Sequence, residues 1–352
     1  MAALTGVISA GTDAAPFTAG NLDSSRLSPV FNRNFLKHAQ EKLVLAEVAE
    51  QFDLPRQAGA QTMRFFRRGV ANVENVAALT EGTPTTVFTH ATLENVEVSL
   101  LQYGAATKIT DTRSETDLIK QLELETARMG EEAALHLDTQ IRDTAYDAYE
   151  AAAITAASTA GLFIDKNSVT AADRMLTAGD IDKAATMLME NRAPTFAGDC
   201  YIAVVSPRQA YDLRRDSTWL NVGTYQAKEM IYKGEIGKIF NVKVIVSTNP
   251  KTVTAAIDWN ADGDATDAAT ADIVAEAHTL TFEAAFVLGR ECLGTIKLGS
   301  NSPLAPSLII NDKADKSDPL NQFMTAGWKA YYASMVLNTS YGVVIRSEQN
   351  AL

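Results

Sequence analysis

The chain is poor in cysteine and histidine for its 352 residues. Its two cysteines, Cys200 and Cys292, lie far apart and form neither a CxxC pair nor a disulfide framework. This usage is typical of a reducing cytoplasm, and Cys200, beside an apolar run, is expected to be a small core residue. None of the four histidines pairs at metal-ligand spacing, so we expect them to be surface or packing residues and expect no zinc site.

Basic residues are also scarce, with 31 lysines and arginines against 43 acids and a net charge of −12. A chain this acidic gains nothing by releasing counterions from a polyphosphate. We therefore do not expect a protein that reads nucleic-acid sequence. A protein that only encloses DNA stays compatible with this charge.

Membrane, export and catalytic signals are missing as well. There is no run of the roughly 20 apolar residues that a spanning helix needs. A signal peptide would begin with a positively charged region, but no lysine or arginine precedes Arg26. We expect a soluble protein without an export signal. The motifs GxSxG, GxxxxGK[ST] and GxGxxG do not occur, so we do not expect an enzyme.

What is present predicts a globular chain of mixed α+β class. Apolar residues make up 46% and charged residues 21%, enough for a sizeable core in two domains or in one large domain with lobes. Apolar spacings of three and four predict helices, and β-branched runs between Gly and Pro signals predict strands. The expected helices are 29–52, 112–155, 180–189 (capped by Asp180) and 207–215, the expected strands lie within 60–111, 201–205, 242–246 and 279–299, and the segment from 319 should pack onto the body.

The strands of 60–111 should form a long hairpin whose first limb is basic. Arg64, Arg67 and Arg68 carry that charge. Three interpretations stay open: a solvated strand face, a nucleic-acid contact, or a contact with an acidic face of another copy of the chain, where opposite charges would fix the register. A ribbon of two strands is marginal on its own in water, so we favour the contact between copies.

The segment 251–278 is strongly acidic, with six acids and one lysine. Asp258, Asn260, Asp262 and Asp264 occupy positions 1, 3, 5 and 7 of a calcium loop, with Gly263 at position 6. Position 12 is Ala269 rather than the bidentate glutamate. The four residues are therefore candidate Ca²⁺ ligands, and an exposed turn rich in Asp and Asn is the alternative.

Three groups of short motifs occur in order along residues 30–350. They are Leu79–Pro84 with Gln102–Gly104 and Ile109–Asp111; Tyr201–Pro207 with Gly234–Gly237; and Asp318–Gln322 with Gly327–Lys329 and Leu337–Asn338. Together they resemble the motifs of tailed-bacteriophage major capsid proteins with the Hong Kong 97 type coat fold, and more closely those of the podovirus coat family typified by the phage N-four.

This resemblance implies an architecture. It would consist of an N-terminal arm (1–55), an extended β-hairpin loop (56–108), a peripheral domain with a long spine helix (109–180), an axial domain (181–279) carrying an acidic insertion (251–278), and the second part of the peripheral domain (280–352). No catalytic residue and no cofactor is implied.

The resemblance also implies a function. The chain would be a structural protein that self-assembles as hexamers and pentamers into an icosahedral shell enclosing double-stranded DNA. Scaffold and portal proteins would be partners, decoration proteins would be further candidates, and assembly would occur in the host cytoplasm without a membrane. The alternatives are an encapsulin-like shell that encloses cargo enzymes, a metal-assisted hydrolase using the acidic loop, and a monomeric calcium-binding surface protein.

Overall fold

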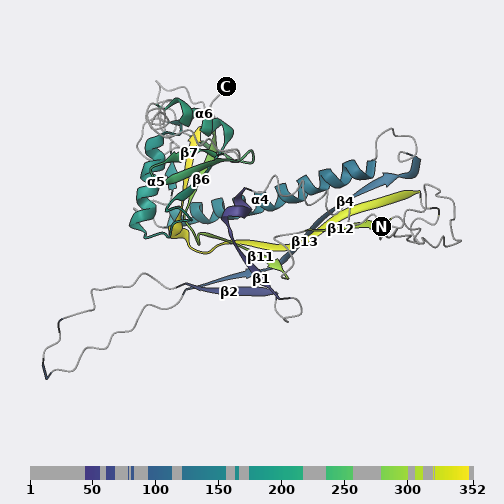
Figure 1. Ribbon diagram of the computed structural model, residues 1–352, viewed down its shortest axis with the longest axis horizontal. Helices are drawn as coiled ribbons and strands as arrows, with labels where there is room; N and C mark the ends of the chain where they lie inside the picture. Colours follow the sequence, from purple (N-terminus) through teal and green to yellow (C-terminus); the bar gives the residue numbers. More distant parts are fainter. Residues whose placement is uncertain are drawn as a thin grey trace, which may run out of the picture.

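A computed structural model describes residues 44–55, 61–67, 78, 81–82, 94–112, 121–155, 163–165, 174–216, 235–256, 279–299, 306–311, 320 and 322–348. One long helix, α4 (Gln121–Thr155), packs along two β-sheets, and a two-stranded ribbon lies below one of them (Figure 1). Within these residues, no helix combines the length and the apolar character that crossing a bilayer demands.

Helix α4 follows from the regular apolar spacing of its sequence. Met129, Ala133, Leu137 and Ile141 recur every four residues and are all buried, as the spacing predicts. Thr126, which interrupts the apolar stripe, is also buried. Its hydroxyl donates to the carbonyl of Glu123 in the preceding turn, 2.9 Å away, so the buried polar group has a partner. The helix therefore presents one continuous buried face over most of its length, while the predicted residues 113–120 lie outside the described part.

A five-stranded sheet packs under the N-terminal half of α4 (Figure 1). Its long strand β13 (Phe323–Val336) pairs antiparallel with β4 (Leu101–Thr110), β11 (Leu293–Leu298) and β12 (Ser307–Asn311), and β1 (Glu50–Leu54) extends it in parallel with β11. The segment from 319 thus packs onto the body as predicted. Gly104 is required in β4, because a Cβ there would lie 2.6 Å from the carbonyl oxygen of Trp328.

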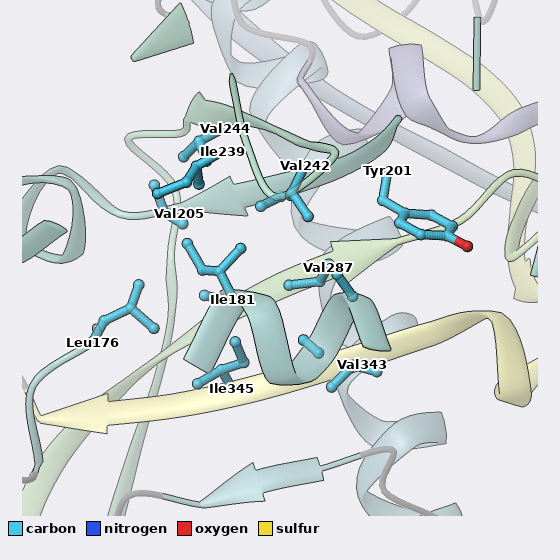
Figure 2. Close-up of a cluster of buried hydrophobic side chains, with 14 of the residues drawn as sticks. Leu176, Ile181, Tyr201, Val205, Ile239, Val242, Val244, Val287, Val343 and Ile345 are labelled. Carbon is cyan, nitrogen blue, oxygen red and sulfur yellow. The ribbon is translucent and has the colours of Figure 1, made fainter. Parts of the chain in front are cut away.

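A seven-stranded sheet lies at the C-terminal end of α4. Its order is β5 (Phe163–Asp165), β14 (Gly342–Glu348), β10 (Thr279–Leu288), β6 (Tyr201–Val205), β8 (Val242–Val246) and β7 (Glu235–Ile239), with β9 (Lys251–Ala256) also paired to β10. Helix α5 (Ala178–Glu190) covers one face, and its Ile181 packs against Val287 and Ile345 of the sheet (Figure 2). The buried residues of this cluster are valines, isoleucines, alanines and leucines together with Tyr201, so the cluster forms a hydrophobic core.

Local capping fixes the two helices of this region. Ser206 accepts from the backbone N–H of Gln209 at 3.1 Å and begins α6 (Pro207–Arg215) as predicted, with proline in the first turn. In α5 the cap is Thr177 rather than Asp180. Asp180 instead occupies the third helical position, where its carboxylate accepts from the backbone N–H of Thr177 at 2.9 Å.

The helix predicted over 29–52 is wrong at its C-terminal end. Of the predicted range, residues 44–52 are described, and they contain only the short helix α2 (Leu45–Val48). Glu50–Leu54 form the strand β1. The apolar spacing suits a helix, but pairing with β11, whose partner residues begin at Gly294, gives these backbone groups a sheet ladder instead. Tertiary pairing therefore overrides the local pattern.

Described strands lie at three of the predicted boundaries. The hairpin ribbon consists of β2 (Thr62–Arg67) and β3 (Glu94–Ser99), whereas β4 belongs to the five-stranded sheet. The first residues of the predicted acidic insertion (251–278) form β9, a strand of the seven-stranded sheet, and its residues 257–278 lie outside the described part. Strand β10 joins β6 and β14 in one sheet, so residues from both sides of position 280 share a core, and the division into peripheral and axial domains stays a prediction.

Candidate functional site

The β2–β3 ribbon is anchored to the body by one apolar face. Met63 and Phe65 of β2 face Val98 and Val96 of β3, and these side chains pack on a buried cluster from β1, β11 and β13. The rings of Phe52 and Phe65 lie 4.6 Å apart between centroids. A ribbon of two strands is stable here because its inner face has found a third layer.

The other face of the ribbon is exposed and carries charge and one large apolar side chain. The guanidinium Nε of Arg64 donates to a carboxylate oxygen of Glu97 at 2.8 Å, and these two side chains are 60% and 40% exposed. Phe66, in the same strand, is 68% exposed. A screened ion pair adds little to stability at this exposure, so folding alone gives no reason for this charge on the outer face.

The predicted arginine cluster is described only in part. Arg64 lies on the exposed face, and the backbone of Arg67 pairs with that of Glu94 in the hairpin register. Arg68 and the candidate calcium ligands Asp258, Asn260, Asp262 and Asp264 lie outside the described residues. The contact role of the arginines and the calcium site stay predictions; isothermal titration against an Asp258→Ala/Asp262→Ala double variant tests the second.

A polar anchor, made of Asp138, Arg142 and Asn249, ties three segments together. Asp138 of α4 is 1% exposed and accepts from the backbone N–H groups of Leu45 at 2.8 Å and Val44 at 3.3 Å, at the start of α2. Burial raises the pKa of this carboxyl group, against the lowering effect of its hydrogen bonds and of Arg142. The carboxylate thus fixes the point at which the N-terminal segment enters the body.

Arg142 completes the anchor toward the β8–β9 turn. It donates to the side-chain carbonyl of Asn249 at 2.6 Å and to the backbone carbonyl of Pro250 at 3.0 Å. Asp143, 2.9 Å from the guanidinium, also pairs with Lys251 at 3.1 Å. The strand that leads into the acidic segment is therefore held on α4, next to the start of α2.

No feature of the sequence pointed to this anchor. Asp138 is one of many acids on a long helix, and its partners lie about a hundred residues away in either direction. Phe66 did leave a signal, because a Phe65–Phe66 pair in a ribbon with alternating faces must send one ring outward.

The seven-stranded sheet contains a buried polar network. The hydroxyl of Ser206 donates to the carboxylate of Glu283, and the side-chain amide of Gln209 donates to the hydroxyl of Ser347 at 2.9 Å. All four side chains are nearly inaccessible to solvent. A serine next to a carboxylate here has no route to a substrate, so the network ties α6 to the sheet.

The thiols are core residues, as predicted for Cys200. Burial raises the pKa of Cys292 to about 12, so this thiol is not ionised at neutral pH and is a poor nucleophile. His136 packs among Tyr103, Trp328 and Tyr332, as expected for a packing histidine. Over the described ranges, His, Cys, Asp and Glu side chains form no group of three or more that could hold a metal ion.

Comparison with solved structures relates this architecture to viral shells. A chain of the capsid of cyanophage P-SCSP1u superposes with a TM-score of 0.57 at 14% identity, covering 88% of this chain and 89% of that one. A chain of the capsid of Ralstonia phage GP4 gives 0.57 at 13%, covering 88% and 92%. The holo-SrpI encapsulin complex from Synechococcus elongatus gives 0.50 at 9%, covering 86% and 85%.

These likenesses concern the fold, because the identities are low. No protein-family model and no curated protein matches the chain. The likeness nevertheless runs over most of both chains, so it extends far beyond one common motif. The chain has the α+β coat fold of tailed-phage capsid proteins, as its sequence motifs predicted.

Proposed function

We propose that this chain is the major coat subunit of a tailed bacteriophage, a structural protein that assembles as hexamers and pentamers into an icosahedral shell around double-stranded DNA. The observation that carries the proposal is a shared fold over 88% of the chain with proteins of phage capsids. The net charge of −12 supports it, because an acidic wall would not adhere to packaged DNA.

The exposed face of the β2–β3 ribbon supports a contact between copies. A shell subunit needs surfaces that meet other copies head to tail. Phe66 and Arg64 combine an apolar side chain with a charge that selects the partner. In this proposal Arg64, Arg67 and Arg68 contact an acidic face of the neighbouring subunit.

The finer parts of the proposal concern partners and place. Scaffold and portal proteins would guide assembly in the host cytoplasm, and the finished protein would reside in the virion without catalytic activity. Co-expression with candidate scaffold proteins, followed by particle counting, tests the first of these. Unchanged particle yield and shape with every candidate would contradict a scaffold requirement.

Sedimentation of the purified chain, with negative-stain microscopy of the fast fraction, tests the main proposal. Closed shells, or rings of five and six, are expected, alone or with a scaffold protein. The double variant Arg67→Glu/Arg68→Glu should fold as the parent but form no shells. A chain that stays monomeric with and without scaffold would refute the shell function, and normal shells from the double variant would refute the arginine contact.

An encapsulin-like compartment is the second candidate, favoured by the likeness to the SrpI encapsulin complex. The contents of the particles separate the two functions. Particles isolated from the native source should contain DNA if the chain is a phage coat protein. Particles that hold a co-purifying enzyme and no DNA would favour the compartment.

A further inference from the structure

The N-terminal half of α4 presents an unusual solvent face. Leu124 and Leu135 are 53% and 49% exposed although both are large apolar residues of a regular helix. They lie eleven residues apart, which is three turns, and so share one side of the helix. Arg128 and Glu131, also exposed, lie between them on the same side. We call these four residues the α4 stripe.

No described element covers this part of the helix. The opposite side of α4 is buried by the five-stranded sheet, through Met129 and Ala133. Farther along the helix, from Asp138, the side that continues the stripe is occupied by α2 and the β8–β9 turn. In Figure 1 the N-terminal half of α4 accordingly has the sheet on one side and no described element on the other.

The order of residues in the stripe is symmetric in a way that selects the partner. About the midpoint between Met129 and Gly130, each leucine is placed opposite the other leucine, and Arg128 is placed opposite Glu131. When two such helices run antiparallel across a two-fold axis, each position meets its mirror position. Leucine would then meet leucine, and arginine would meet glutamate, twice.

We propose that two copies of this chain pair through the α4 stripe, with their α4 helices antiparallel about a two-fold axis that crosses between Met129 and Gly130. The proposal rests on the proposed shell function, since the pairing joins subunits that the shell brings together. A parallel pairing would set each charge against a like charge, because Arg128 would face Arg128. The occupant of the stripe is therefore a second copy in one orientation.

Cysteine crosslinking tests both the pairing and its direction. Copies carrying Leu124→Cys are mixed with copies carrying Leu135→Cys, assembled, and treated with a bis-maleimide that spans about one interhelical distance, roughly 8–10 Å. The mixture should give crosslinked dimers. Copies that all carry the same variant should give no crosslinked dimers, because their two cysteines would lie ~16 Å apart along the helix axis in addition to the interhelical distance. The native cysteines are buried, so the background is low.

A charge experiment separates a contact between copies from a pair within one helix. Crosslinking should decrease when both partners carry Arg128→Glu, and it should also decrease when both partners carry Glu131→Arg. Mixing the two variants should restore it, since a glutamate of one copy then meets an arginine of the other at both charged positions. A pair within one helix gives no such rescue between copies.

The outcomes are distinct from those of the proposed function. Shells that form without crosslinks between the two cysteine variants would overturn the pairing and leave the shell function intact. Crosslinked dimers from Leu124→Cys alone would overturn the antiparallel direction. Crosslinks to a different protein would assign the stripe to that partner and overturn the proposal.

Discussion

Removal of the carboxylate of Asp138 should release the start of α2 from the body. In the Asp138→Ala variant the backbone N–H groups of Leu45 and Val44 lose their acceptor. An unsatisfied buried donor costs about 1–3 kcal/mol. Leu45 is buried and bears this cost in full, Val44 is half-buried and bears part of it, and the variant regains the energy spent on burying the carboxyl group. We therefore expect Asp138→Ala to destabilise the start of α2 by about 2 kcal/mol.

Hydrogen exchange of the peptide that covers residues 44–49 measures this cost locally. A loss of about 2 kcal/mol corresponds to roughly thirty-fold faster exchange if the segment opens on its own. The matched control is Asp147→Ala, since Asp147 lies on the exposed face of the same helix and should leave this peptide unchanged. Exchange at the parent rate in Asp138→Ala would refute the role assigned to the carboxylate.

Three further predictions test other parts of the structure. Because burial raises the pKa of Asp138, the native state holds this proton more tightly than the unfolded chain. The melting temperature of the parent relative to Asp138→Asn should therefore decrease as the pH rises above the ordinary pKa of an aspartate, about 4, and a relative increase would contradict the sign. Gly342→Ala places a Cβ 2.1 Å from the buried hydroxyl of Tyr149 and should cost about 3 kcal/mol in denaturant unfolding, whereas Gly179→Ala, in a roomy helical position, should stabilise. Arg64→Ala removes an exposed ion pair and should change stability by less than about 1 kcal/mol while reducing the yield of shells; a large melting shift would show a folding role instead.

The sequence predicted best the elements whose signals are local. The strand Tyr201–Val205 and the helix Pro207–Arg215 have the predicted ends because a β-branched run, a serine cap and a first-turn proline lie next to each other. Helix α4 was found from its spacing alone. Both kinds of signal depend only on neighbours within a few residues.

The largest error comes from pairing at long range, whereas the misplaced cap of α5 is an error of three residues within one turn. Glu50–Phe52 were assigned to the end of a helix because the apolar spacing before them fits one, and the structure pairs them with a strand more than 240 residues away. The anchor at Asp138 also depends on contacts that are distant in the sequence, about a hundred residues in either direction. Nothing in a single sequence gives that register, so the contact surfaces were the least predictable part of the candidate site.

The strength of the α4 stripe limits when it can act. Burying a whole leucine side chain contributes about 1.5–3 kcal/mol, and the two leucines of each copy are already half-buried. Four half-exposed leucines therefore give roughly 4 kcal/mol, no more than the smallest cost estimated for joining two free proteins, about 4–15 kcal/mol. Other contacts, such as those of the ribbon, must first raise the effective concentration of one helix near the next. Crosslinking between Leu124→Cys and Leu135→Cys copies should accordingly appear in shells and be absent in a dilute solution of free chains, and equal crosslinking in both would contradict this ordering of the contacts.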